Sequence, residues 1–217
     1  MSKMKTDEEI LSSLSLSGKR LSHTIAVAEE CDSLAKLFRL DGKTAGKLHL
    51  AALLHDMTKE LKPAEQMKLC DKLKIEYSTN DIESPKVFHA MTAAALAAEK
   101  YHADDEVCLY IRSHTTGSSA MTLGEKLLYL ADYIEKTRTF PDCVELRRIF
   151  YAAVEENKKS LDDILNDTLI LSFDMTIRNL MDEGAFIHPA TIKARNSLIR
   201  IRNAGQTAAE VPPLTRP

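Results

Sequence analysis

The sequence is poor in the residues that form tight turns and has no long apolar run. Among 217 residues there are seven glycines, seven prolines, six phenylalanines, six tyrosines and no tryptophan. Glycine and proline together reach about half of their average usage. Folds with many short strands need frequent turns, so this composition argues against a β-sandwich or barrel. No apolar run could span a membrane, and none follows the basic start as in a signal peptide.

Neither net charge nor cysteine content points to a special partner. Lys and Arg number 29 and Asp and Glu 32, for a net charge of −3, so neither nucleic acid nor a membrane surface is expected as the main partner. There is no C-x-x-C pair, which is typical of free thiols in a reducing cytoplasm. The four cysteines are Cys31, Cys70, Cys108 and Cys143. We therefore expect a soluble cytoplasmic protein.

Apolar residues recur with helical spacing, whereas no short segment alternates strictly, so the sequence predicts an all-α fold. Thr6 with Glu9 and Thr122 with Glu125 have the spacing of capping boxes. Ser84 before Pro85 is a further helix-start signal. We expect a helix from Thr6, a loop over 74–84, and helices over these ranges: 18–38, 43–55, 63–73, 85–101, 105–113, 122–134, 142–156, 159–182 and 189–202.

Histidines and aspartates stand singly on several of these predicted helices. Any one of them, taken alone, is most simply a hydrogen-bonded core residue. A carboxylate in an apolar stretch is costly unless it is paired or binds a cation, and five helices that each offer such a group favour a metal site. Imidazole nitrogens and carboxylate oxygens are standard ligands of Fe, Mn, Ni, Co and Zn. The candidate ligands are His23, His55, Asp56, His89, His114 and Asp132.

Four histidines and two aspartates exceed what one structural zinc ion needs. They suffice for two metal ions if one carboxylate bridges them. A bridging Asp56 would hold two ions about 3.5–4 Å apart, an arrangement that activates a water and clamps phosphoryl oxygens during an in-line displacement. No cysteine neighbours this set in the sequence, so a thiolate site is not expected.

In this order the six residues resemble the HD-domain metal-dependent phosphohydrolases, and in particular their symmetrical bis(5'-nucleosyl)-tetraphosphatase branch. The His55-Asp56 pair alone would indicate only the superfamily. Thr115-Thr116-Gly117 and Ala131–Glu135, in order, make the likeness to the branch more specific. It extends from about Lys19 to Asn203. The segments that carry it are Lys19–Thr24, Ala51–Lys59, His114–Gly117, Glu125–Glu135, Arg138–Pro141 and Ile187–Asn196.

The resemblance implies an HD-domain helical bundle with a di-iron centre, although Mn, Co, Ni or Zn would also suit the ligands. It implies cleavage of diadenosine tetraphosphate at its middle to two ADP, through a metal-bridging hydroxide that attacks a phosphorus. By position the six candidates would be the ligands, with Asp56 as the bridge, and Asp56 and Lys59 would be catalytic. Thr116 and Gly117 would offer backbone N–H groups. The implied substrate contacts are Arg20, Lys59, Thr116, Gly117, Arg138, Ile187, His188 and Arg195.

The chain is then divided into a helical lead (1–18), an HD metal-binding domain (19–140), C-terminal helices packed on the same domain (141–203) and a flexible tail (204–217). The expected partner is a small nucleotide substrate, not nucleic acid or a membrane. The sequence leaves the oligomeric state open, and a homodimer would need an exposed helical face.

Two other interpretations stay open. Other HD phosphohydrolases cleave nucleoside mono- or triphosphates or guanosine alarmones; the Gly-Tyr-Pro signature of the cyclic-dinucleotide subgroup is absent here. The chain could instead be a non-catalytic nucleotide-binding helical protein with a structural metal. Six ligands for two ions leave coordination positions open, which favours catalysis. His49 and His102 are expected to be surface residues outside the ligand set.

Overall fold

The structure, a computed structural model, describes residues 6–210, with side chains to residue 204. These residues form eleven α-helices and one short 3-10 helix, and no strand occurs among them, which confirms the predicted all-α fold. The elements are α1 (Asp7–Ser13), α2 (Gly18–Leu37), α3 (Gly42–Leu54), α4 (Pro63–Leu73), α5 (Thr79–Glu83), η1 (Pro85–Val87), α6 (Phe88–Tyr101), α7 (Asp105–Ser113), α8 (Leu123–Ile134), α9 (Pro141–Glu156), α10 (Leu161–Asp182) and α11 (Pro189–Glu210).

Local capping signals set several helix starts. Both predicted capping boxes are present: Thr6 with Glu9 opens α1, and Thr122 with Glu125 opens α8. In each box the hydroxyl accepts from the glutamate backbone N–H, and the glutamate accepts from the cap N–H. The carboxylate of Asp104 accepts from the backbone N–H of Val107 and begins α7.

The prediction for the segment around Ser84 was wrong in two respects. The expected loop over 74–84 contains the short helix α5, whose first turn is held by Asp81 accepting from Ser78. Ser84 stands at the N-cap position of the 3-10 helix η1, but its hydroxyl makes no capping hydrogen bond, and its N–H closes the end of α5 by donating to the carbonyls of Asn80 and Asp81. The chain then makes the 3-10 helix η1 before α6 begins at Phe88.

The last helix is longer than predicted. We expected it to end at residue 202 and a tail to begin at 204, but α11 continues to Glu210. Alanine is the best helix former, and the stretch from Ala204 to Ala209 holds three alanines, whereas the prolines of the expected tail follow only from Pro212. The remainder of that tail, 211–217, lies outside the described residues.

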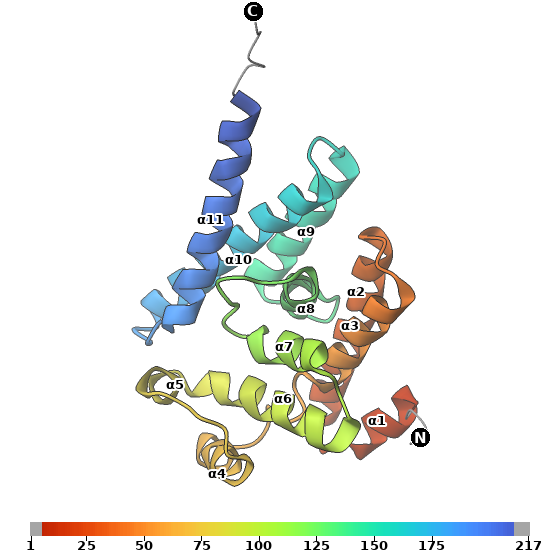
Figure 1. The fold of residues 1–217 in the computed structure, drawn as a ribbon, viewed down its shortest axis with the longest axis vertical. Coiled ribbons are helices and arrows are strands. Elements are labelled where there is room, and N and C mark those ends of the chain that lie inside the picture. Colours follow the sequence, from red (N-terminus) through yellow and green to blue (C-terminus); the bar gives the residue numbers. More distant parts are fainter. Residues whose placement is uncertain (1–5, 211–217) are drawn as a thin grey trace, which may run out of the picture.

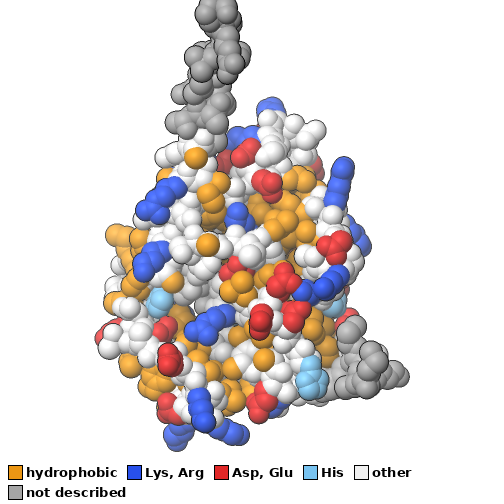
Figure 2. All heavy atoms as spheres, viewed as in Figure 1, with side chains coloured by type: hydrophobic (Ala, Val, Ile, Leu, Met, Phe, Trp, Pro, Cys, Tyr) orange, Lys and Arg blue, Asp and Glu red, His pale blue; other side chains and the backbone are white. Residues whose placement is uncertain are grey.

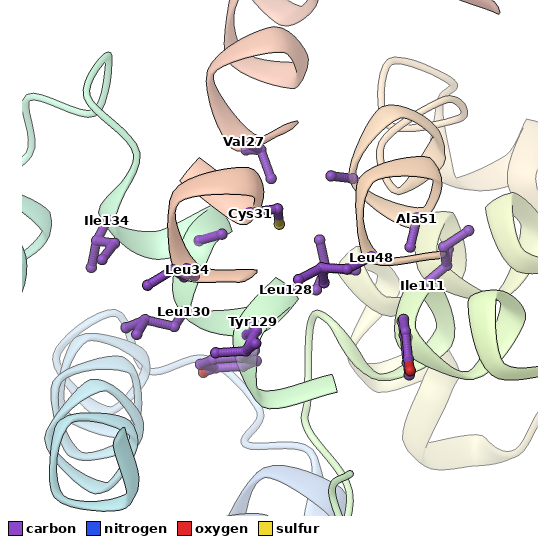
Figure 3. Packing of buried hydrophobic residues seen from close by; sticks show 14 of the residues in the cluster. Val27, Cys31, Leu34, Leu48, Ala51, Ile111, Leu128, Tyr129, Leu130 and Ile134 are labelled. Carbon is purple, nitrogen blue, oxygen red and sulfur yellow. The ribbon is translucent and has the colours of Figure 1, made fainter. Parts of the chain in front are cut away.

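Helix α8 lies near the centre of the molecule and contacts α2, α3, α7, α9 and α10 (Figure 1). Figure 3 shows Cys31 of α2, Leu48 of α3 and Leu128 of α8 in the space between these three helices, and all three side chains are fully buried. One cluster of buried apolar residues extends from Ile10 to Leu198. Because α8 is surrounded in this way, a polar side chain on its last turn is brought close to several other helices.

The surface agrees with the balanced composition. On the face seen in Figure 2, basic and acidic side chains are intermingled rather than gathered by sign. The apolar side of α2 differs from the expected pattern at Ile25, which is 38% exposed. Among the described residues, no helix combines the length and apolar character that crossing a membrane requires.

Candidate metal centre

The structure brings the six predicted ligand residues together from five helices. Potential ligand atoms form two groups of three, and within each group the atoms lie within 4.8 Å of one another. One group comes from His23, His55 and Asp132, and the other from His55, Asp56 and His114. The residues are His23 on α2, His55 and Asp56 after α3, His89 at the start of α6, His114 after α7, and Asp132 in the last turn of α8.

The two carboxylate oxygens of Asp56 face different pairs of histidines. Oδ2 lies 3.7 Å from Nε2 of His23 and 3.5 Å from Nε2 of His55. Oδ1 lies 3.1 Å from Nε2 of His89 and 3.7 Å from Nε2 of His114. The residue is 2% exposed. A carboxylate in this position can bridge two metal ions, one beside each pair of histidines.

Asp132 completes the side of the centre that His23 and His55 form. Its Oδ1 lies 3.0 Å from Nε2 of His23 and 3.9 Å from Nε2 of His55. The same oxygen accepts a hydrogen bond of 2.6 Å from Arg138. Its side chain is 20% exposed, so Asp132 is less buried than its apolar surroundings in the sequence suggested. The last turn of α8 is incompletely covered, since the adjacent Tyr133 is also partly exposed.

Backbone carbonyls fix the tautomer of two histidines. Nδ1 of His55 lies 2.7 Å from the carbonyl of Ala52, and Nδ1 of His114 lies 2.6 Å from the carbonyl of Ile111. A carbonyl only accepts, so Nδ1 of each ring carries a proton and Nε2 is the nitrogen directed toward the centre. Buried polar atoms without a hydrogen-bond partner are costly, and a cation would satisfy such atoms by accepting their electron pairs. Three such atoms lie in the centre: Nε2 of His23, Nε2 of His55 and Oδ1 of Asp56.

Burial and neighbouring charges set the protonation states that ligation needs. Burial lowers the pKa of His55 to about 4 and that of His89 to about 3, so both rings are neutral at pH 7. Burial alone would raise the pKa of Asp56, but the histidines around it hold that pKa well below its usual range. Asp132 behaves likewise, with Arg138 opposing burial and keeping the pKa low. The anionic carboxylates therefore face the neutral imidazoles of His55 and His89.

Three basic side chains predicted to contact substrate border the centre. Arg20 donates to Oδ2 of Asp56 at 2.7 Å, and Arg138 pairs with Asp132. Nζ of Lys59 lies 3.1 Å from Nε2 of His89, and burial lowers the pKa of this lysine. The three side chains are 27%, 28% and 33% exposed, in the order Arg20, Arg138, Lys59. They are positive groups within reach of both solvent and the candidate ligands.

The turn after His114 holds Thr116 and Gly117, but not in the manner expected. The N–H of Gly117 donates to the carbonyl of Ser113 at 2.7 Å, so the amide that was expected to face a phosphate is already engaged. Glycine is required here because φ is +66° and a Cβ would lie 2.7 Å from Cζ of Phe173.

A pocket of about 540 Å³ adjoins this turn and includes Thr116, Gly117 and His188 in its lining. A second pocket of about 440 Å³ also includes Thr116 and His188. Nδ1 of His188 accepts from the N–H of Ala190, and its Nε2 lies 3.3 Å from Oδ1 of Asp81. His188 therefore lies between two pockets that also share Thr116 in their lining.

Ile187 and Arg195 do not line either of these pockets. The guanidinium of Arg195 forms two hydrogen bonds with the carboxylate of Asp174, the one from Nη2 to Oδ2 at 3.3 Å. This ion pair joins α11 to α10. The contact supports a structural role for Arg195, in contrast to the substrate contact that the resemblance implied.

Glu135, to which no role was assigned from the sequence, contacts His23 directly. It is fully buried, and its Oε1 lies 3.1 Å from Nδ1 of His23. Burial would lower the pKa of His23, but hydrogen bonds to Asp132 and Glu135 outweigh burial and raise this pKa to about 8. One signal was available: a carboxylate at the C-terminal end of a helix is disfavoured by the helix dipole, so a specific partner was to be expected.

Two histidines and the four cysteines were expected to lie outside the ligand set, and the structure places none of them in either group of candidate ligand atoms. His49 lies between the carboxylates of Asp7 and Asp32, away from the six residues. His102 is exposed and ends α6 with φ of 54°. The cysteines carry free thiols and belong to neither group of candidate ligand atoms: Cys31, Cys70, Cys108 and Cys143.

These features define a helical metal-binding domain whose buried histidines and aspartates could hold two ions. The HD domain family model matches residues 20–137, a span that includes all six candidate ligands. The chain therefore belongs to the HD domain family, as the resemblance implied. This membership implies binding of a divalent metal.

The similar proteins agree with this assignment. The chain is 34% identical to a symmetrical bis(5'-nucleosyl)-tetraphosphatase of Bacillus subtilis, over 85% of this chain and 91% of the relative. It is 32% identical to a protein of the same name from Staphylococcus aureus, over 74% and 82%. A solved structure of a predicted HD superfamily hydrolase involved in NAD metabolism, from Clostridium acetobutylicum, matches with a TM-score of 0.79 and 35% identity, over 92% of this chain and 100% of that one.

Proposed function

We propose that this protein is a symmetrical bis(5'-nucleosyl)-tetraphosphatase, a phosphoric anhydride hydrolase that cleaves diadenosine tetraphosphate to two ADP. One observation carries the proposal. The buried carboxylate of Asp56 directs its two oxygens toward separate histidine pairs, in a chain that shares 34% identity over 85% of its length with a relative of that name. A bridged pair of metal ions is an arrangement suited to phosphoryl transfer.

The proposed ligands form two sides that share Asp56. His23 and His55 face Oδ2 of Asp56 and also Oδ1 of Asp132, while the other two histidines face Oδ1 of Asp56. Iron is the metal we propose, and the same nitrogen and oxygen donors also suit Mn, Co, Ni and Zn. Bound ions would supply positive charge to polarise phosphoryl oxygens and would activate a water for attack. The complete ligand set is His23, His55, Asp56, His89, His114 and Asp132.

The chain's own basic groups would bind and orient the polyphosphate. Arg20 and Arg138 each hold a candidate ligand carboxylate and remain partly exposed. A guanidinium has five N–H donors, so each arginine keeps donors that can meet a phosphate while it fixes the carboxylate. Lys59, next to His89, would place a point charge where negative charge increases during the reaction.

The nucleoside would occupy the pocket beside Thr116. Its volume of about 540 Å³ is within the ordinary range of small-molecule sites. Tyr77 and Met91 supply apolar surface, and His188 with Thr116 supplies polar groups that could fix a base or ribose. The route from this pocket to the centre follows the turn after His114.

Product analysis tests the function. The purified chain is incubated with diadenosine tetraphosphate, and parallel reactions contain nucleoside mono- and triphosphates and a guanosine tetraphosphate alarmone. We expect ADP as the sole product and much slower turnover of the other nucleotides. AMP with ATP as products, or preference for an alarmone, would contradict the proposal. Elemental analysis of the same preparation identifies the metal.

A further inference from the structure

The proposed chemistry assigns no role to Glu135, although this buried carboxylate contacts the candidate ligand His23 directly. We infer that Glu135 is a positioning residue that holds His23 in the tautomer and orientation needed to bind a metal. The inference rests on the proposed metal centre. It assigns Glu135 a role through His23 and no contact with substrate.

The contact fixes which nitrogen of His23 is free. Oε1 of Glu135 lies 3.1 Å from Nδ1 of the ring. An ionised carboxylate only accepts hydrogen bonds, so Nδ1 carries a proton. Nε2 then faces Oδ1 of Asp132 at 3.0 Å and Oδ2 of Asp56 at 3.7 Å. A ring held in this way presents the one nitrogen that lies among the other candidate ligands.

Glu135 is itself held by several groups, so its position is set before any metal binds. The hydroxyl of Thr137 donates to Oε1 at 2.7 Å, and the backbone N–H of Thr137 donates to Oε2. The guanidinium of Arg147 donates to the carbonyls of Ile134, Glu135 and Arg138 and thereby fixes the turn after α8. The carboxylate itself meets three donors: Nδ1 of His23 and the hydroxyl and backbone N–H of Thr137. Glutamine has only one amide oxygen, so it cannot accept from all three in the same arrangement.

His23 differs in this respect from the other candidate histidines. Nδ1 of His55 and of His114 meets a neutral backbone carbonyl, and the ring of His89 lies beside Lys59. A carboxylate partner raises the donor strength of a ligating imidazole more than a carbonyl does, because it stabilises positive charge on the ring. The side of the centre built on His23, His55 and Asp132 should therefore depend on Glu135, and the opposite side should not.

The test is metal binding by the Glu135→Gln chain. The full-length protein is stripped of metal and titrated with Mn²⁺, and free Mn²⁺ is followed by electron paramagnetic resonance. For the wild type we expect two ions per chain, in keeping with the proposed centre. For Glu135→Gln the affinity of one position should fall by about 10–100-fold, the usual effect of losing such a partner, with the other position little changed. Excess Mn²⁺ should restore hydrolysis, which a merely structural defect would not allow.

Glu125→Gln is the matched control. Glu125 is also a buried glutamate of α8, 1% exposed, but it accepts from Thr122 and Ser118 and contacts none of the candidate ligands. This variant should lose stability through its capping box and keep the Mn²⁺ affinity of the wild type. Thermal unfolding of the metal-free chains separates loss of fold from loss of metal.

The possible failures can be told apart. A wild-type chain that binds no Mn²⁺ contradicts the proposed metal centre itself. A wild type that binds two ions, with Glu135→Gln binding them equally tightly, overturns only the role of Glu135. If Glu135→Gln does not fold, Thr137→Val decides, because it removes one donor to the carboxylate and keeps the charge: lowered affinity supports the inference and unchanged affinity overturns it.

Discussion

Two regions of the molecule bury different kinds of polar residue. Among residues 6–204, every buried histidine, aspartate and glutamate lies at or before Glu135, within the helices up to α8 and the turns that follow them. The buried polar residues of α10 and α11 are neutral: Asn166, Thr168, Ser172 and Thr191. Buried ionisable groups are costly unless paired or ligated, so their concentration in the first region indicates chemistry there and packing in the second.

The second region still acts on the first through contacts with α8 and the turn after α7. The ring of Phe173 on α10 lies 4.7 Å, centroid to centroid, from that of Tyr129 on α8. Phe173 also limits the space at Gly117, and His188 at the start of α11 reaches the pocket beside Thr116. The C-terminal helices thus pack against α8 and border the pocket beside Thr116, but they provide none of the six candidate ligands.

The largest expected effect comes from a carboxylate in the first region. Asp56→Ala should lower hydrolysis of diadenosine tetraphosphate by more than the roughly 10–100-fold that loss of an outer-shell partner costs, because both proposed metal positions lose a ligand. Metal per chain should fall with it. Asp167→Ala is the matched change in the second region, since Asp167 forms ion pairs with Lys159 and Arg202 and is not a candidate ligand. Rates and elemental analysis are compared at equal protein concentration, and full activity of Asp56→Ala would contradict the assignment.

A core change in the second region should have the opposite profile. Phe173→Ala removes a fully buried ring and should lower the free energy of unfolding by about 3–5 kcal/mol. The folded variant should keep its metal, because no candidate ligand is altered. Met181→Ala on the same helix is the control, since Met181 is 66% exposed and should cost little. Urea denaturation and metal analysis measure both effects, and metal loss from folded Phe173→Ala would break the proposed division between the regions.

The features that were predictable from the sequence are mainly local. A capping box spans four residues, so Thr122 and Glu125 indicate the start of α8 without knowledge of the fold. The order of histidines and aspartates was also visible, and the structure brings those residues together. Ser84 shows where local signals fail: it stands at the start of η1, but its hydroxyl makes no capping hydrogen bond, which the Ser-Pro pair does not reveal.

The remaining features depend on contacts between distant residues. Glu135 meets His23 across 112 positions of sequence, and no spacing rule links two such residues. Gly117 was interpreted as an opening for phosphate, whereas its neighbours show that Phe173 excludes a side chain there. The way Asp56 divides its two oxygens depends on the placement of three other helices, α2, α6 and α7. Each of these requires the tertiary structure.

The smallest expected effect distinguishes two histidines of the same segment, His49 and His55. Partial burial would lower the pKa of His49, but hydrogen bonds to Asp32 and Asp7 outweigh it and raise that pKa, whereas burial lowers the pKa of His55 to about 4. A raised pKa means that the folded state binds the proton more tightly. The stability from His49 is therefore complete below the unfolded pKa of about 6.5 and is lost as pH rises through the folded pKa.

His49→Gln isolates this contribution, because the groups of the candidate metal centre titrate alike in both chains. The wild type should exceed the variant in free energy of unfolding by up to about 1 kcal/mol at low pH, since partly exposed ion pairs contribute little. The difference should shrink as pH rises from below the unfolded pKa of about 6.5 through the raised folded pKa of His49. Urea denaturation across this range measures it. A difference that grows with pH would show that the contacts of His49 with Asp7 and Asp32 do not stabilise its protonated form.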